Sequence, residues 1–205
     1  MRRSSGMLVL GVMLSAVPAL AQPKPAPTVR AHRIDDPIRI DGKLDEEIYA
    51  RTDAISEFVQ QEPDEYAPAT EKTEAWIFFD EDNVYVSARN WESQPGRRVA
   101  NEMRRDTAQL RQNDTFAVLF DTFHDKRNGY IFYANAIGGL ADSQVTDEGP
   151  PNADWNTVWD VRTGNFDGGW ILEMAIPFKS LRYQPGSDQV WGINLRRVVR
   201  WKNEW

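Results

Sequence analysis

The stretch that decides the fold is residues 76–88, WIFFDEDNVYVSA, in which two apolar runs flank three acidic residues and an asparagine. Short runs rich in aromatic and β-branched side chains predict strands, because these side chains pack well on a pleated surface. Asp and Asn are typical of the tight turns that join strands. The stretch therefore predicts a β-hairpin.

The same pattern recurs along the chain. Ile34 and residues 38–40 open it, and further runs of strand length occupy residues 115–120, 130–137, 170–176 and 190–199. In the last run Trp191, Ile193 and Leu195 alternate with Asn194 and Arg196, so one face is apolar and the other polar. Many short strands separated by turns indicate an all-β sandwich or barrel.

Helical signals are few and short. Residues 41–49 predict a turn followed by one or two helical turns, with Leu44 and Ile48 on one face. Residues 177–181, which begin with a proline, predict a single turn. We expect an antiparallel β-sandwich of the jelly-roll or immunoglobulin-like kind with one or two short helical turns, because strands that are apolar on both faces suit two packed sheets.

Composition excludes several classes of protein. The chain has 205 residues, no cysteine, two histidines and a formal net charge of −7. The absence of cysteine excludes disulfide scaffolds, thiolate zinc sites and cysteine nucleophiles. The acidic balance argues against a nucleic-acid partner, because duplex affinity depends on clustered lysines and arginines. The chain also carries eight tryptophans, and their roles need an explanation.

The N-terminal residues have the pattern of an export signal. Arg2 and Arg3 precede an apolar run at residues 7–17, and Ala19-Leu20-Ala21 supplies a cleavage site. Residues 1–21 are therefore predicted to be a secretory signal peptide, with an N-terminal membrane anchor as the alternative. Residues 22–29 are predicted to be a proline-rich linker, and residues 30–205 one domain. We expect the protein to be exported, in the periplasm or at the outer membrane of a Gram-negative bacterium.

Four blocks resemble the family 9 carbohydrate-binding modules, in the order of that family. They are residues 40–46 (IDGKLDE), 79–86 (FDEDNVYV), 113–121 (NDTFAVLFD), and 169–178 (GWILEMAIPF) followed by WGIN at 191–194. The resemblance extends over residues 38–199. It implies an antiparallel β-sandwich that binds oligo- or polysaccharides, often with structural calcium, as part of a larger exported protein.

Residues 121–130, DTFHDKRNGY, resemble a bacterial group in which such a module precedes an outer-membrane β-barrel. This resemblance implies that the domain is truncated at its C-terminal end and that its own C-terminal β-barrel is a partner.

Candidate ligand-binding residues are Trp91, Trp155, Trp159 and Asn156, because sugars stack on aromatic faces while nearby polar groups bind their hydroxyls. Core packing is the alternative for these tryptophans, and Trp76, Trp170 and Trp191 are expected in the core. The sugar-binding relatives clamp the sugar between two tryptophans. Arg111 stands where this resemblance places the first of them, and it is a candidate for binding hydroxyls or the carboxylate of an acidic sugar.

Asp121, Asp125 and Asn128 gather in one loop and are the candidate ligands of a structural calcium ion, which prefers such oxygens. A tight turn uses the same residue types, so that alternative stays open.

The function predicted from the sequence is non-catalytic carbohydrate binding that supports carbohydrate catabolism or the capture of envelope glycans. Two alternatives stay open: a periplasmic structural domain that docks on a downstream outer-membrane β-barrel without binding sugar, and part of an O-glycosyl hydrolase. Glu173 lies alone among apolar neighbours, either as an acid/base group or as the partner of Arg196 or Arg197. Any hydrolase activity is expected to belong to an attached domain.

Overall fold

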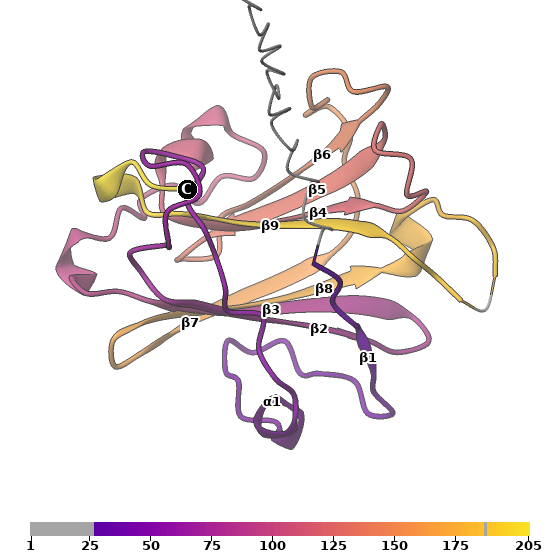
Figure 1. The fold of residues 1–205 in the computed structure, drawn as a ribbon, viewed down its shortest axis with the longest axis horizontal. Helices are drawn as coiled ribbons and strands as arrows, with labels where there is room; N and C mark the ends of the chain where they lie inside the picture. The colour runs from indigo at the N-terminus through magenta and orange to yellow at the C-terminus, as the bar shows by residue number, and fades with distance from the viewer. Residues whose placement is uncertain (1–26, 187) are drawn as a thin grey trace, which may run out of the picture.

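The computed structural model describes residues 27–186 and 188–205. It is a sandwich of two β-sheets that lie one above the other in Figure 1. The strands are β1 (His32–Arg33), β2 (Thr73–Phe79), β3 (Asn83–Trp91), β4 (Thr115–Asp121), β5 (Gly129–Asn135), β6 (Leu140–Val145), β7 (Asp160–Phe166), β8 (Gly169–Pro177) and β9 (Gly192–Val198). The all-β sandwich expected from the sequence is confirmed.

One sheet has five strands in the order β1-β2-β3-β8-β7, and the other has four in the order β6-β5-β4-β9. All neighbouring strands are antiparallel except β1 and β2, which are parallel. The predicted hairpin is β2–β3, in which Ile77 pairs with Val86. Strand β9 lies at one edge of the four-stranded sheet, where it pairs with β4.

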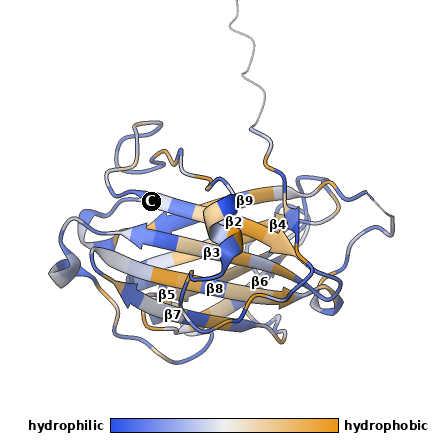
Figure 2. Cartoon of the chain, turned by 90° about the horizontal axis from the view of Figure 1, so that it is seen from below, coloured by the Kyte–Doolittle hydropathy of each residue, from blue (hydrophilic) through white to orange (hydrophobic). Residues whose placement is uncertain are grey.

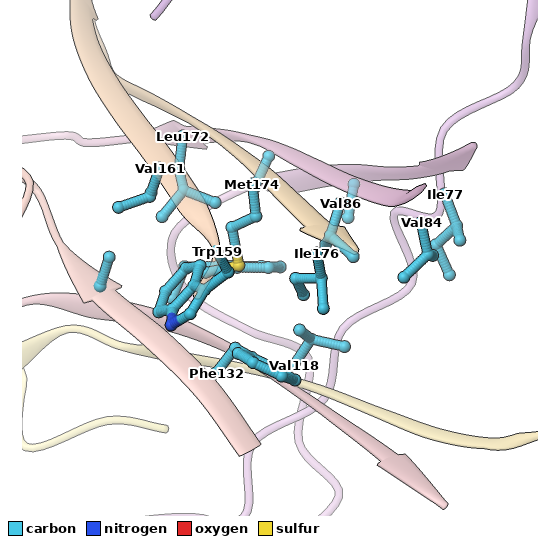
Figure 3. Close-up of a cluster of buried hydrophobic side chains, with 14 of the residues drawn as sticks. Ile77, Val84, Val86, Val118, Phe132, Trp159, Val161, Leu172, Met174 and Ile176 are labelled. Atoms are coloured by element: carbon cyan, nitrogen blue, oxygen red, sulfur yellow. The ribbon is translucent and has the colours of Figure 1, made fainter. Parts of the chain in front are cut away.

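The core fills the space between the sheets. Alternate side chains of the central strands point inward, among them Val118 and Phe132 from the four-stranded sheet and Val86, Met174 and Ile176 from the five-stranded sheet (Figure 3). All five are 0% exposed, as expected for close packing. Because inward and outward side chains alternate, this packing also fixes which residues the four-stranded sheet presents outward.

A second apolar cluster covers the outer face of the five-stranded sheet. Trp76, Phe78 and Tyr85 point outward from β2 and β3 and are covered by Ile38 and Tyr49 of the N-terminal segment. Figure 1 shows this segment, with α1 (Glu47–Arg51), beneath that sheet. Figure 2 shows the molecule from below, with hydrophilic (blue) and hydrophobic (orange) residues alternating along the chain on this side. Trp76 is therefore buried, but in this cluster and not between the sheets.

Five short helices complete the described residues: α1, η1 (Pro95–Arg97), η2 (Ala108–Gln112), η3 (Phe178–Ser180) and η4 (Arg200–Lys202). Of these, α1 and η3 were expected from the sequence. Among the described residues, no helix combines the length and the apolar character needed to span a membrane.

The first strand lies earlier than the sequence indicated. Residues 34–40 form no strand, and β1 consists of His32 and Arg33. Ile34 and Ile38 are buried as single side chains in the second cluster, which explains their apolar character. The predicted signal peptide lies outside the described residues, whereas residues 27–29, at the end of the predicted linker, are exposed and have no regular secondary structure.

Candidate functional site

The outer face of the four-stranded sheet carries a row of four residues, one from each strand: Arg196, Ala117, Tyr133 and Ala141. We call this set the Ala117 row. Adjacent strands lie about 4.8 Å apart, so Arg196 and Tyr133 stand about 10 Å apart with only the methyl group of Ala117 between them. The neighbouring row contains Asn194, Leu119, Ile131 and Ser143. Ala141 and Ser143, at the β6 end of the two rows, are buried. The members from β4, β5 and β9 are half-exposed or exposed and present apolar side chains and polar groups on one surface.

Two guanidinium groups lie against aromatic rings on this surface. Arg111, at the end of η2, places its Cζ 6.0 Å from the centroid of the Tyr133 ring and donates from Nε to Tyr133 Oη at 3.4 Å. The Cζ of Arg196 lies 5.3 Å from the centroid of the Trp205 ring. Such cation–π contacts hold a guanidinium over an aromatic face and leave its N–H groups free at the edge.

A groove of about 590 Å³ runs along the unpaired edge of β9. Asn194, Arg196 and Trp205 line it on one side, and Phe58 and Tyr66 line it from the segment between α1 and β2. Backbone hydrogen bonds hold Trp205 to that segment, because its carbonyl accepts from Gln61 N at 2.6 Å. In Figure 1 the C-terminal residue lies beside this segment. Arg196 thus belongs both to the Ala117 row and to the groove.

The structure sorts the arginines between residues 97 and 111 into two groups. Arg98, Arg104 and Arg105 form salt bridges with Glu92, Glu102 and Asp142, respectively. Arg97 lies over the ring of Trp201, with its Cζ 4.2 Å from the centroid. Arg111 has no carboxylate within salt-bridge distance among the described residues, and the same holds for Arg196.

Burial and the charge of Arg111 both act on the pKa of Arg196. Desolvation by the surrounding side chains lowers this pKa from its usual range, and the positive charge of Arg111 lowers it further. Glu62 acts in the opposite direction. The two guanidinium groups therefore repel each other, and within the described residues neither is held by a salt bridge.

Trp91 lies on the opposite sheet. Its ring packs edge-on against Phe166 with centroids 4.8 Å apart, and Lys72 Nζ lies 5.2 Å from its centroid. Its indole N–H points to Glu74 Oε2 at 3.4 Å. The structure therefore separates Trp91 from Arg111, and the two cannot line one site.

Trp155, Asn156 and Trp159 share the connection between β6 and β7, and their contacts are with Tyr130, Phe132, Asp106 and Asp142. Trp159 is 4% exposed, and its indole Nε1 donates to Asp142 Oδ2 at 2.9 Å. Trp155 is half-buried, with its ring centroid 5.1 Å from that of Tyr130. Asn156 donates to Asp106 Oδ2 at 3.0 Å. The ring of Trp159 presents no face to a ligand, because it fills the core.

In the loop of Asp121, Asp125 and Asn128 the side-chain oxygens accept hydrogen bonds from the chain itself. The carboxylate of Asp121 accepts from the backbone N–H groups of Asp125 and Lys126, at 3.1 and 2.7 Å. The carboxylate of Asp125 accepts from Arg127 N, Asn128 N and Asn128 Nδ2. Asn128 Oδ1 accepts from Asp147 N. These contacts are those of a tight turn tied to the neighbouring loop at Asp147, the alternative that the sequence left open.

Glu173 partners neither Arg196 nor Arg197, so that expectation from the sequence is wrong. It lies in β8 of the five-stranded sheet, whereas both arginines lie in β9 of the other sheet. Its carboxylate accepts from Asp41 N, Gly42 N and Tyr49 Oη, all in the segment that covers the sheet. Burial raises the pKa of Glu173 to about 7. The contacts give this carboxylate a structural role.

Sequence reasoning missed three residues of the surface: Tyr133, Arg196 and Trp205. The alternation in residues 130–135 separates Tyr133 from Tyr130 and Phe132, and alternation in residues 191–196 also puts Asn194 and Arg196 together. The alternation could therefore have identified Tyr133 and Arg196 as outward-facing residues. The sequence could not show that β4 would bring the two strands into one row.

The family model described as Carbohydrate family 9 binding domain-like matches residues 40–199. No curated protein matches the chain. One similar solved structure is a family 9 carbohydrate binding module from Caldicellulosiruptor kristjanssonii in complex with cellotriose. It is 14% identical in sequence, the match covers 82% of this chain and 75% of that chain, and the TM-score is 0.59. A module of this family from the same organism in complex with glucose has 15% identity, coverage of 81% and 78%, and a TM-score of 0.57. A protein from Bacteroides uniformis has 11% identity, 83% coverage of both chains and a TM-score of 0.60. At such identities these likenesses show the fold.

Proposed function

Because the chain belongs to the family of carbohydrate family 9 binding domain-like proteins, we propose that it binds carbohydrate without catalysing a reaction, on the outer face of the four-stranded sheet. Solved members of similar fold are complexes with cellotriose and glucose, which supports a sugar as the class of ligand. The proposed site consists of the Ala117 row together with Arg111, Asn194 and Trp205.

The observation that carries this proposal is the arrangement of the Ala117 row. Tyr133 and Arg196 stand on either side of a residue that has only a methyl side chain. Aromatic faces stack against the C–H groups of a sugar ring, while polar groups at their edge bind the hydroxyls. Tyr133 supplies the ring, and Arg111, Arg196 and Asn194 supply the polar groups.

A binding role, and not hydrolysis, is supported by the chemistry of the two central rows. Glycoside hydrolysis normally uses a pair of carboxylates on either side of the scissile bond. The eight residues of the two rows contain none. The buried carboxylate of Glu173 is engaged by the covering segment on the other sheet.

The test is isothermal titration calorimetry of the chain against a panel of neutral and acidic oligosaccharides. We expect at least one saccharide to bind, and Tyr133→Ala to weaken that binding by about tenfold or more, since aromatic stacking is lost. Trp91→Ala removes an aromatic ring from the opposite sheet and serves as the matched control. If no saccharide in the panel binds to a chain with an intact circular dichroism spectrum, the proposal fails.

We further propose that the protein is an exported module of a larger protein in a Gram-negative envelope, where it supports carbohydrate catabolism or glycan capture. The N-terminal pattern of basic residues, an apolar run and Ala19-Leu20-Ala21 supports export. Expression in a Gram-negative host followed by mass spectrometry tests it. We expect a periplasmic chain whose first residue is Gln22, and an uncleaved cytosolic chain would contradict export.

A further inference from the structure

Arg111 and Arg196 form a positive pair on a protein of opposite overall charge. The chain carries 31 acidic against 24 basic residues. Even so, these two side chains lie near enough for Arg111 to lower the pKa of Arg196. Elsewhere in this chain a nearby carboxylate neutralises an arginine by a salt bridge, as Glu92 does for Arg98. The unpaired arrangement leaves both guanidinium forks available to something outside the chain.

The two aromatic rings orient these forks. Tyr133 lies beneath Arg111 and Trp205 beneath Arg196, at 6.0 and 5.3 Å from ring centroid to Cζ. A guanidinium stacked on a ring interacts through its face, so its N–H groups stay at the periphery. The planar fork matches the two oxygens of a carboxylate and can donate two parallel hydrogen bonds.

The balance of donors and acceptors on this surface also selects the ligand. A neutral sugar presents hydroxyls, each of which needs an acceptor as well as a donor. Arginine only donates, and the two central rows contain no carboxylate to accept. The side-chain acceptors of the two rows are Asn194 Oδ1, Tyr133 Oη and the buried Ser143 Oγ, while the carboxylates of Glu57 and Glu65 line the groove beyond Arg196. Such a donor-rich surface fits a ligand with extra acceptor oxygens and negative charge.

We infer that the carbohydrate bound at the Ala117 row is an acidic glycan, whose uronic-acid carboxylate is held between Arg111 and Arg196. This inference rests on the proposed function and specifies its ligand class. In this inference the sugar ring lies over Ala117 against the face of Tyr133 that Arg111 does not cover, and the carboxylate accepts from the guanidinium groups. Binding involves no covalent step.

The experiment compares three probes by calorimetry with the mature chain: tetragalacturonate, its methyl ester and cellotriose. The ester keeps the shape of the acidic probe but removes its charge. We expect tetragalacturonate to bind at least tenfold more tightly than the ester, with an affinity that falls as salt rises, because salt screens the attraction.

Variants test the two arginines. Arg111→Gln and Arg196→Gln are each expected to weaken tetragalacturonate binding by about 10- to 100-fold, the usual effect of losing a charge-assisted hydrogen bond. Arg162→Gln removes the same charge from the opposite sheet, where exposed Arg162 lies in β7, and is the matched control. Circular dichroism and the melting temperature establish that each variant is folded.

The outcomes separate the two proposals. Equal binding of tetragalacturonate, its ester and cellotriose overturns the acidic ligand and leaves carbohydrate binding intact. Acid-selective binding that survives both arginine substitutions also overturns it, because the carboxylate is then held elsewhere. Absence of binding by all three probes and by the wider panel overturns the proposed function itself.

Discussion

Glu173 Oε2 accepts a hydrogen bond of 2.7 Å from the backbone N–H of Gly42, although 131 residues separate them in the sequence. This contact ties the N-terminal segment to the centre of the five-stranded sheet. Asp41 N and Tyr49 Oη donate to the same carboxylate at 3.1 and 3.2 Å. Glu173 is 0% exposed, so these donors replace the water that it loses on folding.

Stability should therefore depend on pH through Glu173. Its pKa rises from 4.5 to about 7 on folding, since burial disfavours the charged form. The folded chain keeps this proton to a higher pH than the unfolded chain does. The resulting contribution of Glu173 to the free energy of unfolding is therefore complete below about pH 4.5 and is lost as pH rises through 7. We expect a loss of about 3 kcal/mol over this range, measured by urea unfolding at several pH values.

Glu173→Gln should remove that dependence. The amide does not titrate, so the free energy of unfolding becomes flatter between about pH 4.5 and 7. The substitution should also cost about 1–3 kcal/mol at low pH, because one donor of the covering segment loses its acceptor. Glu57→Gln, at an exposed position, is the control that keeps the slope. If the free energy of unfolding of Glu173→Gln still falls between pH 4.5 and 7, another titrating group causes the pH dependence.

Trp159 should matter for stability and not for ligand binding. Trp159→Phe keeps an aromatic ring in the core but removes the N–H that donates to buried Asp142 at 2.9 Å. We expect a loss of about 1–2 kcal/mol in chemical unfolding and unchanged saccharide affinity. Trp191→Phe is the matched control, because the indole N–H of Trp191 donates to exposed Gln189. A large drop in affinity for Trp159→Phe would contradict this assignment.

Tyr133 should show the opposite pattern. Its ring is half-exposed, so Tyr133→Ala should change the free energy of unfolding by no more than about 1 kcal/mol. Saccharide affinity should fall by about tenfold or more, because the stacking surface is removed. Calorimetry and urea unfolding of the same preparation measure both quantities. Unchanged affinity in a folded Tyr133→Ala chain would place the ligand elsewhere.

Calcium should leave the melting temperature unchanged. The oxygens of Asp121 and Asp125 accept backbone N–H groups, so the turn is already held without a cation. We expect the same melting curve in EDTA and in millimolar calcium chloride. Asp125→Ala should lower stability by about 1 kcal/mol in both buffers, since the turn loses its hydrogen bonds. A calcium-dependent rise in melting temperature that Asp125→Ala abolishes would restore the metal site.

The strands that were predicted from the sequence are those with strong apolar runs, such as β2, β3 and β8. Strands β6 and β7 were missed because their sequences, LADSQV and DVRTGNF, are half polar. Asp142 and Ser143 are buried in β6, and the arginine, tryptophan and backbone donors that satisfy Asp142 come from other segments. A single sequence does not display such long-range partners.

The site shows the same limitation. Polar sequence neighbours made Trp159 a candidate for the surface, yet its ring is buried and its N–H donates to Asp142, 17 residues away in the sequence. Tyr133 and Arg196 each had the correct alternation, but only the order β5-β4-β9 brings them to either side of Ala117. Arg111 was selected from the sequence and does lie on this surface.

The central claim, that carbohydrate binds to the outer face of the four-stranded sheet, is tested most directly by mapping backbone amide chemical shifts as saccharide is added. We expect the shifts to change in the Ala117 row, at Ala117, Tyr133, Ala141 and Arg196, and at Asn194 beside it. Changes confined to the connection around Trp155 and Asn156, or to the neighbourhood of Trp91 on the opposite sheet, would contradict the claim.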